Sequence, residues 1–120
     1  MTPLPDDAVV VRGGLNRPDD FAQGSGVTLD TTGKLDNVSV NAAAGLSLAD
    51  LTKPDPGTGY PGVPHRHVGV TTAGAIRAAG GDVVPKPTRR NPHHAVLKGL
   101  TPDQAARLFQ PTVLNPNRSP

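Results

Sequence analysis

Glycine and proline interrupt this chain so often that no helix or strand in it can be long. Of the 120 residues, 14 are Gly and 14 are Pro, and both residues end or weaken regular elements. The apolar segments between them are short and aliphatic, and the aromatic residues are only Phe21, Tyr60 and Phe109. We therefore expect a small core and long Pro/Gly loops, above all over residues 53–64 (KPDPGTGYPGVP).

The order of the short segments predicts an α+β fold. The length fits one domain, which we expect over residues 1–110, followed by a C-terminal tail over 111–120 that Pro111 excludes from a helix. Short β-branched or apolar runs predict a small antiparallel or mixed sheet. Its strands are expected at residues 8–11, 27–29, 35–40, 68–70, 82–84 and 95–97, the second and third forming a hairpin around 31–34.

Capping patterns predict two or three short helices. Thr101-Pro102-Asp103-Gln104 combines a Thr N-cap, a Pro at the first helical position and a Gln at the third. Ser47 and Thr72 are further N-cap candidates. Pro18, which carboxylates follow, can start a helix that ends at Gly24.

Two residue types are missing, and their absence excludes whole classes of chemistry. Without Cys there is no disulfide, iron–sulfur cluster or thiol nucleophile, and without Glu no Glu-dependent mechanism is available. No apolar run is long enough to span a membrane, and Asp6, Asp7 and Arg12 lie where a signal peptide needs apolar residues. We expect no membrane association and a cytoplasmic protein, or one delivered into a target cell as part of a larger secreted protein.

Charge is divided unevenly along the chain. Residues 1–60 hold four Lys or Arg against eight Asp, a net charge of −4, whereas residues 61–120 hold eight Lys or Arg against two Asp, a net charge of +6. This division favours one surface suited to an anion such as RNA.

The segment 85–100 (PKPTRRNPHHAVLKGL) gathers cations and histidines with no acidic residue. Cations bind phosphate, and histidine exchanges protons near neutral pH. Adjacent strand residues face opposite sides, so one of the two histidines faces a given pocket. We predict catalytic roles for His93 or His94, Arg89 and Arg90, and substrate-binding roles for Lys86, Thr88 and Lys98.

A second histidine pair, His65 and His67, precedes the expected strand at 68–70. These residues share no standard metal-site spacing with His93 and His94, so we predict no metal and no cofactor. Instead, His65 or His67 is expected to bind substrate and to complete an acid–base pair with His93 or His94.

Arg12 follows an apolar run and precedes Gly13-Gly14, where backbone can approach a ligand closely. This opening resembles that of ADP-ribosyltransferases, in which the arginine holds the dinucleotide pyrophosphate. Ser39, in Val38-Ser39-Val40, would be the matching residue on the second strand. The chain departs from that family in having no Glu for the usual catalytic position.

A broader resemblance covers most of residues 68–116. The run VGVTTAGAIRAAGGDVVP, with Asn91-Pro92-His93, Gly99-Leu100-Thr101-Pro102 and FQPT after it, resembles a group of small uncharacterised bacterial proteins. The ending is also similar in style to C-terminal toxin modules of contact-dependent and toxin–antitoxin systems, many of which are small metal-independent ribonucleases. The resemblance implies a bacterial toxin, RNA as a substrate and an acidic antitoxin or immunity protein as a partner.

Three hypotheses follow from the sequence. The first is a toxin-type, metal-independent ribonuclease centred on His93 or His94. The second is an ADP-ribosyl-type transferase toxin centred on Arg12. The third is a non-catalytic module whose Pro/Gly loops bind a partner protein.

Overall fold

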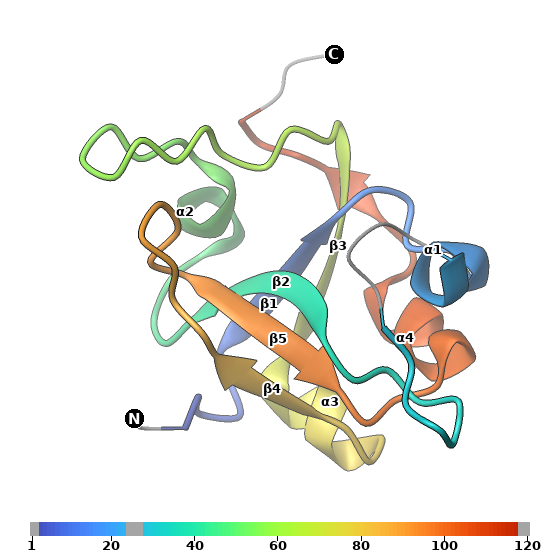
Figure 1. Ribbon diagram of the computed structural model, residues 1–120. Helices are drawn as coiled ribbons and strands as arrows, with labels where there is room; N and C mark the ends of the chain where they lie inside the picture. Colours follow the sequence, from blue (N-terminus) through green and yellow to red (C-terminus); the bar gives the residue numbers. More distant parts are fainter. Residues whose placement is uncertain (1–2, 24–27, 118–120) are drawn as a thin grey trace.

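Residues 3–23 and 28–117, which the computed structural model describes, are built around one six-stranded antiparallel sheet (Figure 1). The strand order is β4-β5-β2-β1-β3-β6, so β1 and β2 lie side by side in the centre. This confirms the α+β prediction. The strands are β1 Val9–Gly13, β2 Val38–Ala43, β3 His67–Thr72, β4 Asp82–Pro85, β5 His94–Lys98 and β6 Val113–Leu114.

Four short helices accompany the sheet within the described residues, where the sequence predicted two or three. They are α1 Pro18–Gln23, α2 Leu48–Thr52, α3 Ala73–Ala78 and α4 Pro102–Phe109. The N-caps predicted at Ser47, Thr72 and Thr101 are confirmed, because each hydroxyl accepts a hydrogen bond from a backbone N–H three residues on. None of the helices formed by residues 3–23 and 28–117 has the length and apolar composition needed to cross a membrane.

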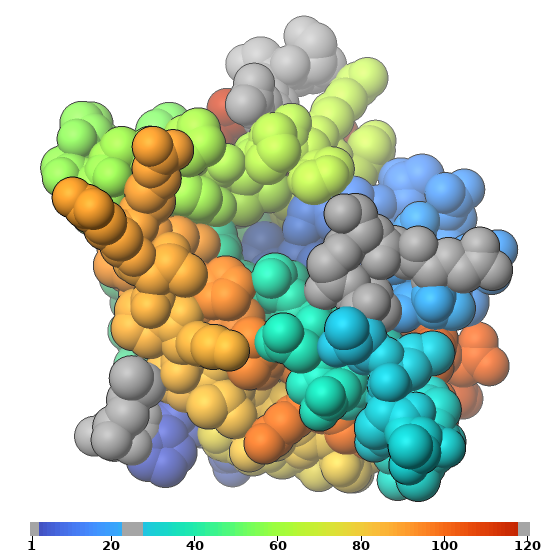
Figure 2. Space-filling model, viewed as in Figure 1, coloured from blue at the N-terminus to red at the C-terminus, as the bar shows by residue number. Residues whose placement is uncertain are grey.

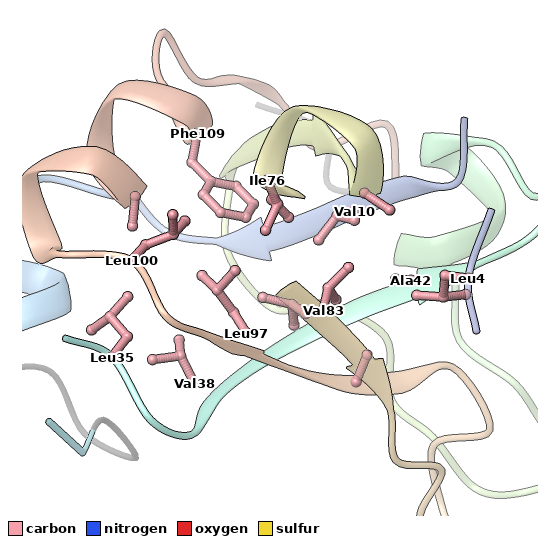
Figure 3. Close-up of a cluster of buried hydrophobic side chains, with 14 of the residues drawn as sticks. Leu4, Val10, Leu35, Val38, Ala42, Ile76, Val83, Leu97, Leu100 and Phe109 are labelled. Atoms are coloured by element: carbon pink, nitrogen blue, oxygen red, sulfur yellow. The ribbon is translucent and has the colours of Figure 1, made fainter. Parts of the chain in front are cut away.

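The main core lies on one face of the sheet, beneath α1, α3 and α4. Ile76 and Phe109 point from α3 and α4 toward the strands (Figure 3). The ring of Phe21 on α1 lies 5.9 Å from that of Phe109, centroid to centroid, so α1 joins the core through an aromatic contact. The other buried side chains of this layer are aliphatic, as the composition predicts.

The opposite face carries a smaller apolar cluster. Val11 and Val68 of the sheet pack there with Leu51 of α2 and Val63 of the segment that leads to β3. In Figure 1, α2 lies over one end of the sheet, away from α1 and α4. The remainder of this side is therefore available for a binding site.

The hairpin predicted around residues 31–34 is wrong in its extent. The turn at Asp30–Lys34 closes only an isolated bridge between Leu29 and Leu35, and β2 begins later, at Val38, and pairs with β1 and β5. Burial of alternate β2 side chains against the main core favours this central position. Gly24, the predicted helix end, and Val27 lie outside the described residues.

Residues 111–117, part of the segment predicted as a C-terminal tail, contact the sheet and the segment that leads to β3. Val113–Leu114 pair with the beginning of β3, and the buried side chain of Asn115 donates to the carbonyls of Val63 and His65, both at 2.9 Å. A two-residue edge strand has no periodicity that a sequence pattern can reveal.

Candidate functional site

The two central strands separate at one end of the sheet. Among the described residues, β1 and β2 pair only between Val9–Val11 and Asn41–Ala43. Beyond that point Arg12–Gly13 continue beside β3, while Ser39 continues beside β5. We call the opening between them the β1–β2 cleft.

The β1–β2 cleft contains two adjoining pockets of about 490 and 200 Å³, which share Arg12, Gly13 and Ser39. Figure 2 shows this face hollowed between the light green segment that precedes β3 and the teal of β2, with the dark blue of β1 at the bottom. Other residues lining the larger pocket include Asn16, Arg17, Asp20 and His65. Other residues lining the smaller pocket include Asn41, Tyr60, Asn91 and His94.

Arg12 is half-buried and held from two sides. Its guanidinium carbon lies 4.4 Å from the centroid of the Phe21 ring, a cation–π contact. Its Nη1 donates to Asn16 Oδ1 at 2.8 Å. Burial lowers the pKa of Arg12, and the charge of Asp20 opposes this shift, but a guanidinium remains cationic at any physiological pH. The cleft therefore has a fixed positive charge.

The carboxylate of Asp20 forms its ion pair with Arg17 and not with Arg12. Its Oδ2 accepts from Arg17 Nε at 3.3 Å and from the Arg17 backbone N–H at 2.9 Å. These bonds lower the pKa of Asp20. The carboxylate is thus engaged at the start of α1, and Arg12 keeps N–H groups for a ligand.

Gly13 allows the imidazole of His65 to lie against the backbone of β1. A Cβ at position 13 would collide with the His65 ring and with Val63. The His65 side chain is exposed and lines the larger pocket. Glycine at this position therefore brings a histidine to the edge of the cleft.

Ser39 and His94 form a hydrogen-bonded pair across β2 and β5. Asn41 lies opposite His94 in the sheet, so Ser39 is the diagonal neighbour of His94 on the same face. His94 Nε2 lies 3.0 Å from Ser39 Oγ, and His94 Nδ1 lies 2.8 Å from the carbonyl oxygen of Lys86. Because a carbonyl only accepts, Nδ1 carries the proton, and in the neutral ring Nε2 accepts from the Ser39 hydroxyl.

A buried amide network supports this pair. Asn91 Nδ2 donates to Asn41 Oδ1 at 2.8 Å. Asn41 Nδ2 donates to Tyr60 Oη and to the carbonyl of Leu51, both at 2.9 Å. The network ties β2 to the segments that carry Tyr60 and His94. Sequence reasoning missed it, although an Asn between the apolar residues of a central strand is a signal of such a role.

The predicted site residues of the connection between β4 and β5 lie beside the cleft rather than in it. Lys86, Thr88, Arg89 and Arg90 are exposed in the connection between β4 and β5, and their side chains line neither pocket of the cleft. Lys86 contributes its backbone carbonyl to His94, and the Arg90 carbonyl accepts from Thr58 Oγ1 at 2.8 Å. This connection is therefore anchored next to the site.

The remaining predicted residues lie apart from Arg12 and Ser39. His93 lines a separate pocket of about 410 Å³, and Tyr60 is the one described residue that this pocket shares with the cleft. His67 lies opposite Leu114 in the sheet, and Lys98 is exposed at the end of β5. Of the four histidines, the cleft brings together His65 and His94.

No group of three or more His, Asp or Glu side chains that could hold a metal ion occurs in the part of the chain that the structure describes. The polar groups that line the described part of the cleft are two guanidiniums, one carboxylate, a serine hydroxyl, a tyrosine phenol, two imidazoles and amides. Comparisons with protein-family models, with curated proteins and with solved structures find no match for this chain.

Proposed function

We propose that this protein is an ADP-ribosyl-type transferase toxin that binds a nicotinamide dinucleotide in the β1–β2 cleft. The observation that supports this proposal most directly is the position of Arg12 and Ser39. These are the two residues on which the resemblance to ADP-ribosyltransferases rests, and they come from different strands to line the same two pockets.

The surroundings of Arg12 suit a pyrophosphate. The cation–π contact with Phe21 and the bond to Asn16 fix the guanidinium, so little side-chain entropy is lost when an anion binds. Its planar fork can donate two parallel hydrogen bonds to phosphate oxygens. Gly13 and Gly14 line the larger pocket beside it and allow backbone to approach the ligand.

The size of the cleft is consistent with a ligand of this class. The larger pocket, of about 490 Å³, falls within the range of roughly 300–1,000 Å³ typical of small-molecule sites. The smaller pocket extends it toward Ser39, His94 and Tyr60. A dinucleotide with its pyrophosphate at Arg12 would thus reach the Ser39–His94 pair with one of its ends.

A second candidate is a metal-independent ribonuclease in the same cleft. It is favoured by the presence of Arg12 and His94 in one pocket and of His65 in the adjoining one. Such a site has the parts for RNA cleavage: a base for the 2′-OH, an acid for the leaving 5′-oxygen, and a cation for the charged intermediate. In this ribonuclease hypothesis Arg12 stabilises the charged intermediate, in place of Arg89 and Arg90, for which the sequence analysis predicted catalytic roles.

The purified protein should release nicotinamide from NAD and leave RNA intact in EDTA. Arg12→Lys keeps the positive charge but loses the planar guanidinium that can donate two parallel hydrogen bonds. It should lower kcat/KM for nicotinamide release by roughly 100-fold. Arg90→Lys is the matched control outside the cleft, and thermal melting of both variants checks folding. RNA fragments with 2′,3′-cyclic phosphate ends and unchanged NAD would establish the second candidate instead. If both substrates stay intact, the protein-binding module becomes the preferred hypothesis.

As a toxin, the protein would act in the cytoplasm of a bacterial cell and would be neutralised by an acidic antitoxin or immunity protein. The exposed cations Lys86, Arg89 and Arg90 beside the cleft suit such a partner, because opposite charges speed association and favour the correct orientation. A protein docked there would also cover the entrance near His94.

A further inference from the structure

We infer that the acceptor of the transferred group is an oxygen nucleophile, water or an alcohol, and that His94 is the base that takes its proton. The inference rests on the proposed transferase function. The chain has no Glu for the usual catalytic position of ADP-ribosyltransferases, and the inference assigns the catalytic role to a histidine instead.

The hydrogen bonds of His94 prepare its ring to accept a proton. The Lys86 carbonyl, 2.8 Å from Nδ1, requires the proton to be on that nitrogen, so the lone pair of the neutral ring is on Nε2. Nε2 faces the Ser39 hydroxyl at 3.0 Å. An acceptor hydroxyl that binds beside Ser39, or in its place, would donate to the same lone pair. An oriented imidazole next to a hydroxyl is the arrangement expected of a general base.

The charges around His94 disfavour a cationic acceptor. In the described part of the chain, the other ionisable groups that line its pocket are Arg12 from β1 and Tyr60 from the segment before β3. Lys86 contributes its backbone carbonyl to His94, and its side chain is exposed. Among the described residues, no carboxylate lines the smaller pocket. The Asp20 carboxylate lines the adjoining larger pocket, where it pairs with Arg17. A guanidinium or ammonium acceptor at His94 would therefore lie near Arg12 without a carboxylate in its own pocket, whereas a neutral hydroxyl meets no such repulsion.

The reaction balances without a further reagent. The bond between C1′ of the ribose and the nicotinamide nitrogen breaks, and its electron pair neutralises the pyridinium. The acceptor oxygen forms a bond to C1′, and its proton goes to His94 Nε2, which releases it to solvent. With water as the acceptor the products are ADP-ribose, nicotinamide and a proton.

The test measures nicotinamide release from NAD by the full-length protein, with water alone, with methanol, or with agmatine as a guanidine acceptor. We expect ADP-ribose and methyl-ADP-ribose, and no agmatine adduct. His94→Gln should lower the rate roughly 100- to 10,000-fold. The control is His93→Gln, because His93 lines a separate pocket and should leave the rate within about threefold of the original.

The affinity for NAD separates proton transfer from a structural role of His94. His94→Gln should bind NAD with wild-type affinity in calorimetry while kcat falls, because the Gln amide can still hydrogen-bond to Ser39 and to the Lys86 carbonyl but cannot take up a proton. An agmatine adduct, or a His94→Gln rate equal to wild type, would overturn the inference while leaving the transferase proposal in place. NAD binding measured by calorimetry tests the proposal itself, since failure to bind would refute both.

Discussion

Asn16 connects the backbone of the β1 end to the guanidinium of Arg12. It is fully buried and has φ +55°, a conformation that Asn adopts more readily than most residues. Its Nδ2 donates to the carbonyls of Arg12 and Gly14, and its Oδ1 accepts from Arg12. One side chain thus closes the turn after β1 and holds the cation of the cleft. The sequence suggested Arg12 as a ligand-binding residue, but neither Asn16 nor the ring of Phe21, because both contacts depend on how the turn folds back.

Gly13→Ala should lower the free energy of unfolding by about 1–3 kcal/mol, the usual cost of forcing extra atoms into a packed site. The added methyl would collide with Val63 and with the imidazole of His65. Denaturant unfolding measures the change. Gly57→Ala is the matched control, because the contact recorded for a Cβ there is with the side-chain oxygen Oδ1 of the half-buried Asp55 at 3.2 Å. If both variants have wild-type stability, His65 does not pack against Gly13.

Elements with local signals could be predicted, and elements that depend on distant pairing could not. Thr101 and Gln104 form a capping box within one turn of chain, so four consecutive residues contain all the necessary information. The bounds of β2 depend instead on its pairing with β1 and β5. The two residues of β6 pair with β3, more than 40 positions earlier in the chain, and no local pattern predicts that contact.

Thr101→Ala should lower the stability of the protein by about 1 kcal/mol, because the N-cap hydroxyl no longer accepts from the Gln104 N–H. The effect should extend beyond α4, since Phe109 at its end packs in the main core. Thr31→Ala, in an exposed turn, is the control substitution of the same type. Thermal melting of the two variants compares them, and equal midpoints would show that the cap contributes nothing.

The site belongs to the molecule as a whole, because the sheet topology assembles it. Ser39 and His94 are 55 positions apart in the chain, and their contact follows from the pairing of β2 with β5. Sequence reasoning identified Arg12, His65 and His94 individually, from residue chemistry, and Ser39 from the resemblance to ADP-ribosyltransferases. It grouped His94 with Arg89 and Arg90 because they are neighbours in sequence. Strand order and register, which decide which side chains share a pocket, are set by burial over the whole sheet.

The affinity of this protein for polyanions should depend on which cations are free of ion pairs rather than on how many cations there are. Arg89 and Arg90 are exposed, and no carboxylate lies within ion-pair distance of either among the described residues. Arg17 instead pairs with Asp20, and Arg77 pairs with Asp6 and Asp82.

The double variant Arg89→Ala/Arg90→Ala should therefore elute from heparin at clearly lower salt than Arg17→Ala/Arg77→Ala, although both lose two charges. Wild-type retention should fall steeply with salt, because each phosphate or sulfate contact releases counterions. Equal elution of the two double variants would mean that net charge alone governs binding, and the surface beside the cleft would then have no particular affinity for an acidic partner or for RNA.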